Sequence, residues 1–286
     1  MKHKLWIVAA AVAVFLFALG LTLYPLISNY YSEQHLSEIR TEYMERVEKT
    51  DDSELTEAWE LAARYNEAIK PGAHEEEAFS KEALLAASEG YDAQLNIAED
   101  GIMGYVEIPK IGVDLPIYHG TGADTLEIGV GHLLGSSLPV GGDSIHAVLT
   151  GHSGMARQKM FSDLDRLEVG DVFYLKVLGE TLAYQVDQIK TVLPYDADDL
   201  GIITGEDHCT LVTCTPFGVN THRLLVRGVR IPYEEAETIV EEMVHDAEPA
   251  VSTWEQQYVK SLVLGIAAVA VIGALAGAVY LIRRKR

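Results

Sequence analysis

Three side chains in the sequence have the chemical types that a thiol nucleophile site needs. Cys214 ends an apolar, β-branched run, Arg223 follows nine residues later at the head of a second such run, and His152 follows an earlier one. The thiolate is the attacking form of cysteine, so a neighbouring imidazolium or guanidinium would activate it. His152 could act as general acid toward a leaving amine and later as general base. Arg223 would be a fixed positive donor for an oxygen that becomes anionic.

The same residues also fit structural roles when they are taken one at a time. A lone cysteine in an apolar run is usually a small buried hydrophobe. A histidine after a strand is more often a hydrogen-bonded structural residue, and an arginine on a strand is more often solvated. His222 is a second possible base, although its place beside Arg223 on a regular strand would turn it away from the site.

Several motifs around these residues resemble those of sortases, the cysteine transpeptidases of the Gram-positive surface. The site motifs are Thr210-Leu-Val-Thr-Cys214, the arginine nine residues on, and Leu149-Thr-Gly-His152. The likeness to the class C, pilus-assembling branch runs from about Gly101 to Pro232 and includes Gly104-Tyr-Val-Glu-Ile-Pro-Lys-Ile, Leu115-Pro-Ile-Tyr-His-Gly and Phe173-Tyr-Leu-Lys-Val-Leu-Gly-Glu.

The resemblance implies a mechanism and partners. Cys214 would attack the threonine carbonyl of a Leu-Pro-x-Thr-Gly-like (LPXTG-like) sorting signal, His152 would protonate the departing glycine amine, and Arg223 would stabilise the oxyanion. A lysine amine of a pilin subunit would resolve the thioester, without a metal or organic cofactor. We also expect Thr150 and Thr213, beside the site residues, to contact the substrate.

The resemblance also extends to a lid segment ahead of the barrel. Pilus-assembling sortases carry an Asp-Pro-aromatic lid ahead of the barrel, with the acid near the site arginine and the ring over the cysteine. This chain has Glu77-Ala-Phe79, in which the proline is missing and the acid is one methylene longer. We expect a looser lid with Glu77 facing Arg223 and Phe79 over Cys214; the alternative is a mobile acidic linker.

The elements that must position the site are mainly short strands. The pattern predicts strands over 105–108, 113–118, 146–150, 171–177, 181–192, 209–215 and 221–231, and short helices over 124–128 and 161–167. After Gly228 the apolar phase of the last strand shifts, which predicts a bulge there. A mostly β chain of about eight strands indicates a closed barrel or a sandwich. The resemblance implies the closed eight-stranded sortase barrel.

Upstream of the strands, apolar residues recur at helical spacing. They include Leu36, Ile39, Tyr43 and Val47; a break at Asp51-Asp-Ser53 precedes a second set, Leu55, Trp59 and Ala62. This pattern predicts a helical stalk that packs on the barrel.

Two uncharged runs, Leu5 to Ile27 and Ser261 to Ile282, are long enough to span a bilayer. Basic residues before the first and after the second favour two flanking transmembrane helices with both termini in the cytoplasm and the middle outside. A cleaved signal peptide is the alternative for the first run. The expected organisation is an N-terminal anchor over 1–31, a stalk and lid-like segment over 32–100, the catalytic barrel over 101–232, an acidic helical linker over 233–260, and a C-terminal transmembrane helix with a basic tail over 261–286.

The charge lies between the two runs. All 43 acidic residues fall there, with all but six of the 22 basic ones, and the formal net charge of the chain is −21. This balance argues against nucleic acid as a partner. It indicates a soluble, self-repelling surface on a membrane-tethered domain.

The chain has two cysteines, Cys209 and Cys214. Five residues apart on one strand, they would lie roughly 16 Å apart on opposite faces, too far for a disulfide. A zinc site made by both cysteines with His208 and His222 lacks the close Cys-x-x-Cys pairing of structural zinc. The remaining strand and turn histidines, His119, His132 and His146, are expected to be structural.

Three other functions stay open at this point. A housekeeping-type sortase would use the same residues but pass the acyl group to a cell-wall precursor. A cysteine peptidase would pass it to water. A catalytically inert, membrane-tethered binding module would leave Cys214 unreactive.

Overall fold

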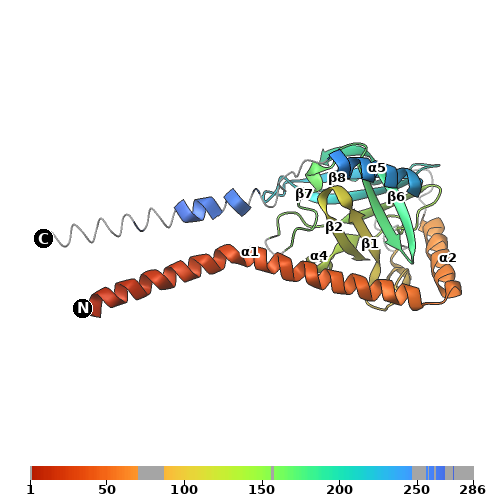
Figure 1. The fold of residues 1–286 in the computed structure, drawn as a ribbon. Helices are drawn as coiled ribbons and strands as arrows, with labels where there is room; N and C mark the ends of the chain where they lie inside the picture. The colour runs from red at the N-terminus through yellow and green to blue at the C-terminus, as the bar shows by residue number, and fades with distance from the viewer. Residues whose placement is uncertain are drawn as a thin grey trace. The chain divides into compact units, whose positions relative to one another are not determined.

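The computed structural model of the 286-residue chain describes residues 2–69, 87–155, 158–246, 256, 258–260, 262–267 and 273. The chain divides into two compact units, residues 1–27 with 249–286, and residues 28–248. The second unit holds the barrel (Figure 1).

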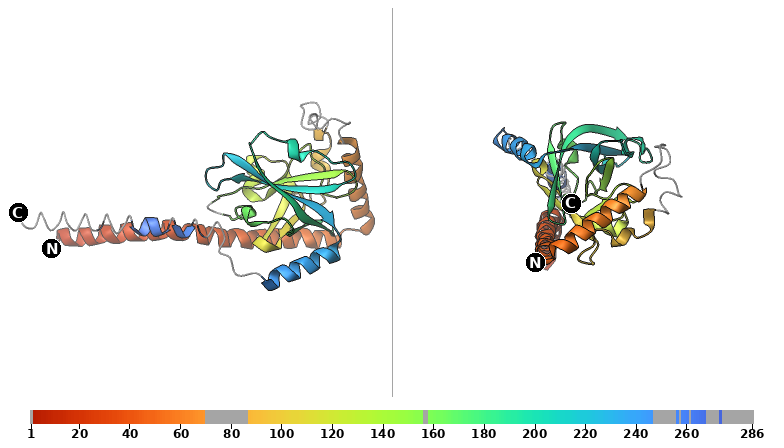
Figure 2. Two further views of the ribbon diagram at one scale, coloured as in Figure 1. Left: turned by 90° about the horizontal axis from the view of Figure 1, so that it is seen from above. Right: turned by 90° about the vertical axis from the view of Figure 1, so that its right-hand side faces the viewer.

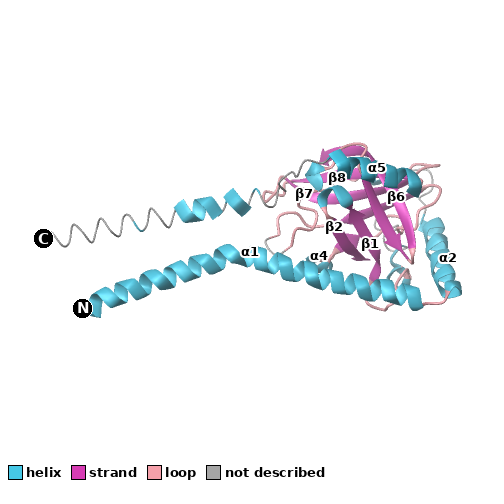
Figure 3. Cartoon of the chain, viewed as in Figure 1, coloured by secondary structure: helices cyan, strands magenta, loops and turns pink. Residues whose placement is uncertain are grey.

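Eight strands close into a barrel in the order β1-β2-β3-β4-β7-β8-β6-β5 (Figure 3). They are β1 (Ile102–Ile108), β2 (Val113–His119), β3 (Val130–His132), β4 (Ile145–Thr150), β5 (Val172–Val177), β6 (Glu180–Val192), β7 (Asp207–Thr215) and β8 (His222–Ile231). The β2–β3 and β4–β7 pairs are parallel, and the other pairs are antiparallel. The predicted closed eight-stranded barrel is confirmed. The three-residue β3 was not predicted, because so short a run carries no readable alternation.

The helices include α1 (Lys2–Lys49), α2 (Asp52–Ile69), α4 (Ala123–Ile128) and α5 (Tyr233–Asp246), with the one-turn 3₁₀ helices η2 (Tyr91–Ala93), η3 (Pro109–Ile111), η4 (Leu164–Arg166) and η5 (Asp198–Leu200). The helix predicted over 161–167 is wrong: this stretch is a turn followed by η4. The turn serves the site, because its first residues fold back onto His152, as described below.

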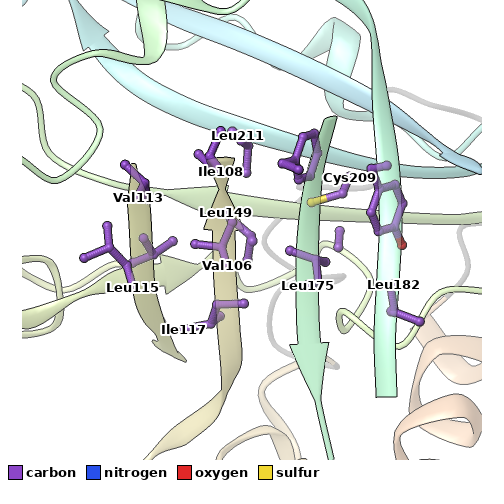
Figure 4. Close-up of a cluster of buried hydrophobic side chains, with 14 of the residues drawn as sticks. Val106, Ile108, Val113, Leu115, Ile117, Leu149, Leu175, Leu182, Cys209 and Leu211 are labelled. Atoms are coloured by element: carbon purple, nitrogen blue, oxygen red, sulfur yellow. The ribbon is translucent and has the colours of Figure 1, made fainter. Parts of the chain in front are cut away.

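The barrel interior is filled by aliphatic side chains from alternate strand positions. Val106, Ile108, Leu149, Leu175 and Leu211 are wholly buried and point toward one another (Figure 4). This alternation leaves the neighbouring positions of each strand on the outer face. The outer face of β4, β7 and β8 is where the site residues lie.

The predicted stalk packs on the barrel. Tyr43 is buried against Ile102 and Tyr105, and its hydroxyl accepts a hydrogen bond from the Leu178 amide at 3.1 Å. Burial raises the pKa of Tyr43 to about 12. The predicted break between the two stalk helices is also confirmed, because Asp51 Oδ1 accepts a hydrogen bond from the Ser53 amide at 2.9 Å and caps α2.

The bulge predicted at Gly228 is wrong in its position. The register of β8 with β7 is regular, and the irregularity lies in β6 between Val186 and Gln188, opposite Gly228. The apolar phase shifts after Gly228 for another reason. Helix α5 covers the outside of the barrel there (Figure 2), and Ile231 packs with its Ala236.

Gly228 is instead fixed by packing, which gives a stability prediction. A Cβ at this position would lie 2.6 Å from the Phe173 ring and 2.9 Å from Tyr184 Cβ, and these two rings stack with centroids 5.6 Å apart. We expect Gly228→Ala to lower the free energy of unfolding by about 1–3 kcal/mol, because the stacked pair must shift. Urea unfolding measures the change. Gly122→Ala is the matched control, since a Cβ there has its nearest neighbour at 4.0 Å; equal losses in both variants would contradict this packing argument.

Among the described residues, one helix, Ala13–Lys49, is long and apolar enough to cross a membrane, and its apolar window is unburied. Length and composition of this kind are shared by signal sequences. For the second predicted span, the structure describes a shorter apolar helix, Tyr258–Ala267, and most of residues 268–286 lie outside the described residues.

Candidate active site

Strands β7 and β8 place Cys214 directly opposite Arg223. The antiparallel register pairs the two residues, so their side chains lie on the same face with Cβ atoms about 4.5–5.5 Å apart. Both residues are partly exposed, and Cys214 is a free thiol. A guanidinium next to a reachable thiol is the arrangement that the sequence predicted.

Strand β4 brings His152 to the same end of the barrel. Its parallel register with β7 pairs Thr150 with Val212, and the Gly151 amide donates to the Val212 carbonyl at 3.0 Å. Strand β4 ends at Thr150, so His152 follows the end of the strand that pairs with β7. The three predicted catalytic residues therefore come from three adjacent strands or strand ends.

The backbone of His152 is held by the turn that follows it. The Phe161 amide donates to the His152 carbonyl at 3.0 Å. A Cβ on residue 151 would lie 2.6 Å from the Phe161 ring, so glycine is needed for the close approach of that ring. Sequence reasoning missed this support; the glycine directly before His152 was its only signal.

We expected Thr213 to contact the substrate, but the structure turns its side chain into the barrel. It is buried, and its Oγ1 donates to the Gly151 carbonyl at 2.8 Å. Its neighbour Cys214 points to the opposite face, so Thr213 is turned toward the backbone before His152. Thr150 is partly exposed on the outer face of β4, the face that carries the site.

The guanidinium of Arg223 is oriented by backbone carbonyls. Its Nη1 donates to the His222 carbonyl at 3.0 Å and to the Asn220 carbonyl at 3.4 Å. Asn220 ends the turn between β7 and β8 with φ of 62°, a conformation that asparagine tolerates better than most residues. These two bonds hold one end of the guanidinium against the backbone of the turn that joins β7 to β8.

An apolar strip continues from the site along the outer face. Val148, Val212 and Leu225 form a buried cluster there, and Leu200 from the segment before β7 packs against it. On β7, Val212 is the residue before Cys214 on this face, and on β8, Leu225 is the residue after Arg223 on the same face. Val148 is wholly buried and Leu225 is 3% exposed, so neighbouring side chains, Leu133, Val192 and Leu200, already cover this apolar strip.

The second cysteine is separated from the site as predicted. Cys209 is free, wholly buried and part of the barrel core, and burial raises the pKa of its thiol well above the ordinary value. Because Cys209 and Cys214 face opposite sides of β7, the zinc set that includes both is not assembled. Among the described residues, no group of three or more His, Cys, Asp or Glu side chains is placed to hold a metal ion.

The other histidines have structural partners. His132 is wholly buried and bonds to Tyr91 and the Ser137 carbonyl, and burial lowers its pKa to about 4. His119 bonds to the Gly101 and Gln94 carbonyls. His222 Nδ1 lies 2.9 Å from Thr221 Oγ1, and its place next to Arg223 turns its side chain away from the Cys214 face.

The proposed lid residues, Glu77 and Phe79, fall within residues 70–86, outside the described part of the chain. Their predicted contacts with Arg223 and Cys214 therefore stay predictions.

The barrel and the Cys-His-Arg set define a protein built for acyl transfer through a cysteine, and comparisons with known proteins agree with this class. A family model described as the sortase domain matches residues 106–231. The crystal structure of sortase C1 from Streptococcus agalactiae is 47% identical, covers 68% of this chain and 98% of its own, and superposes with a TM-score of 0.62. Sortase C from Clostridium perfringens is 40% identical, covers 68% of this chain and 99% of its own, and superposes with a TM-score of 0.58.

A curated relative, sortase D of Bacillus subtilis (strain 168), is 38% identical over 134 residues, which is 45% of this chain and 63% of the relative. The match thus spans somewhat less than two thirds of that relative's length. The chain belongs to the sortase family, whose members are cysteine transpeptidases, and the solved structures that it resembles include several class C sortases.

Proposed function

We propose that this chain is a membrane-anchored cysteine transpeptidase that cleaves an LPXTG-like sorting signal between Thr and Gly and joins the threonine to a pilin lysine. The observation that carries the proposal is the direct pairing of Cys214 with Arg223, next to β4, the strand whose end His152 follows. This arrangement offers a nucleophile, a cation and a proton carrier to an extended peptide.

The reaction runs in two acyl transfers. The Cys214 thiolate attacks the threonine carbonyl carbon, and Arg223 stabilises the oxygen that becomes negative. The Thr–Gly C–N bond breaks as His152 gives its proton to the glycine amine, which leaves a thioester. A lysine amine then attacks the thioester, His152 takes the proton, and the Cys214 thiolate leaves as an isopeptide bond forms.

The pilus branch is supported by the relatives rather than by a feature of the barrel. The Streptococcus pneumoniae sortase C structure bears on pilin substrate specificity, and the Clostridium perfringens sortase C structure was solved with the C-terminal cell wall sorting motif. Sequence identities of 45% and 40% to these two proteins make the same substrate class the best-supported choice for this chain.

The proposed location follows the charge pattern. An apolar helix near the N-terminus would anchor the chain, with the catalytic barrel on the extracellular face and both termini in the cytoplasm. The acidic surface between residues 33 and 255 suits an exposed, soluble domain. Protease protection of each terminus in inverted vesicles tests this topology.

The test of the activity is product analysis with the full chain, an LPXTG peptide and a lysine-containing pilin segment. We expect a thioester whose mass matches the peptide up to threonine, and an isopeptide product when the lysine is present. Free acid as the sole product in the presence of lysine would assign a peptidase instead. Transfer only to a cell-wall precursor amine would assign the housekeeping function, and an unreactive Cys214 would assign the inert binding module.

Phe79→Ala tests the proposed lid. If the Phe79 ring covers Cys214, its removal should raise the initial rate of thioester formation by about three- to tenfold, because the free energy needed to open the lid falls. Intact mass spectrometry at early times measures the rate. Phe217→Ala is not a suitable control because Phe217 lies beside Gly154 near the site. Val169→Ala, at a 67% exposed position outside the site and its neighbouring loops, is the control. Equal rates for wild type and Phe79→Ala would keep the transpeptidase and reject the lid.

A further inference from the structure

The segment between β6 and β7, residues 193–206, covers part of the outer face that carries the site; we call it the β6–β7 loop. Its Leu200 packs against Val148, Val212 and Leu225. Val212 lies two residues before Cys214, about 7 Å along β7. A peptide held at Cys214 and running along this strip would therefore meet the loop within two or three of its own residues.

Hydrogen bonds tie the loop to the barrel at its middle and near its C-terminal end. Asp199 Oδ1 accepts from Gln188 Nε2 at 3.3 Å and from Lys190 Nζ. The Gly205 amide donates to Ser144 Oγ at 3.0 Å. Between these ties, the Gly201 carbonyl lies 2.7 Å from Nδ1 of His146.

The chemistry of these contacts fixes the protonation state of His146. A carbonyl oxygen can only accept, so Nδ1 carries the proton and donates it to Gly201. Nε2 then has a lone pair and accepts from Thr210 Oγ1 at 2.7 Å. Burial lowers the pKa of His146 to about 4, so the ring is neutral at neutral pH and keeps this tautomer.

The surroundings of His146 leave the ring little freedom. It is 1% exposed, stands on β4 beside the His208 ring with centroids 5.5 Å apart, and lies near the ion pair of Arg227 with Asp187. The ring is thus a rigid bridge from Thr210 on β7 to the middle of the loop. Neither of its nitrogens faces Cys214, and the proposed mechanism uses neither.

We propose that His146 is a positioning residue that fastens the β6–β7 loop at Gly201 and so fixes the segment that covers the outer face beside Cys214. The part of this segment in binding the sorting signal rests on the function proposed above. The fastening itself rests only on the bonds of His146 to Gly201 and Thr210. Loss of the ring should loosen the loop and weaken peptide binding while the chemistry at Cys214 continues.

The test compares the full chain with its His146→Phe variant. We expect KM for the LPXTG peptide to rise about five- to tenfold, as for the loss of one well-made buried hydrogen bond, with kcat within about twofold. Alkylation of Cys214 by iodoacetamide should keep its wild-type rate. Amide hydrogen exchange over residues 193–206 should quicken, a readout that does not depend on activity.

His132→Phe is the matched control. His132 is as buried as His146, also has partners on both ring nitrogens, and has its pKa lowered to the same value of about 4. It stands on β3 and bonds to residues outside the loop, so its loss should leave KM and loop exchange unchanged. If both variants changed KM and loop exchange equally, general destabilisation would explain the result, and the proposal would be overturned.

Thr210→Val supplies a second variant if His146→Phe does not fold. It keeps the side-chain shape but removes the hydroxyl that holds Nε2, so the ring can change tautomer and release Gly201. We expect a smaller rise in KM and in loop exchange. Wild-type values for both quantities would overturn the proposal. If the wild-type chain forms no thioester, the proposed function fails, while the exchange comparison still decides whether His146 fastens the loop.

Discussion

Cys214→Ala is expected to abolish thioester formation and to lower transpeptidation by at least about 10⁴-fold, the scale seen when a covalent nucleophile is removed from an enzyme. The physical reason is that the reaction divides one difficult acyl transfer into two easier ones through the sulfur, and alanine offers no atom to carry the acyl group. Intact mass after incubation with the peptide measures the adduct, and product formation over hours gives the residual rate.

Cys209→Ala is the control that the chain itself supplies. Cys209 is also a free cysteine on β7, but it is wholly buried in the barrel core, on the opposite face. Its removal should leave a small cavity that costs about 1 kcal/mol of stability and should leave the adduct intact. An adduct that persists in Cys214→Ala but vanishes in Cys209→Ala would refute the assignment of the nucleophile.

Most of the barrel could be predicted because its strands carry simple signals. Leu178 and Gly179 form the tight connection between β5 and β6, both with positive φ, and Gly179 marks that turn in the sequence. By contrast, β3 is too short to show alternation. The phase shift after Gly228 was misread as a bulge because the sequence does not reveal that α5 covers the outer face at Ile231.

The part of the site that depends on a single strand register, the Cys214–Arg223 pair of β7 and β8, was predictable from the sequence. A nine-residue spacing across a turn puts Cys214 and Arg223 in one cross-strand pair, and periodicity two then gives their common face. Contacts between distant segments were not predictable in this way. The side chain of Thr213 reaches the backbone before His152, and His146 reaches a loop 55 residues further on; neither contact leaves a local pattern.

Arg223→Lys is expected to lower kcat for thioester formation by about 10²-fold or more, the scale of losing an oxyanion donor. Lysine keeps the positive charge, so a purely electrostatic role would be largely rescued. It lacks the guanidinium, in which Nη1 alone bonds to the His222 and Asn220 carbonyls while the N–H groups of Nε and Nη2 remain for the substrate oxygen. Stopped-flow or quenched-flow mass analysis of the first turnover measures the rate.

Arg227→Lys provides the matched comparison, since Arg227 is on the same strand and face as Arg223 and binds Asp187 through two nitrogens, with distances of 3.1 and 2.6 Å. Both substitutions lose a forked donor, but only the one at position 223 stands opposite the thiol. We expect kcat of Arg227→Lys to remain within about threefold of wild type, since a partly exposed ion pair contributes about 1 kcal/mol or less. If Arg223→Lys retained full activity, charge alone would suffice at that position, and the directed donor would have to be sought in the backbone amides of the turn between β7 and β8.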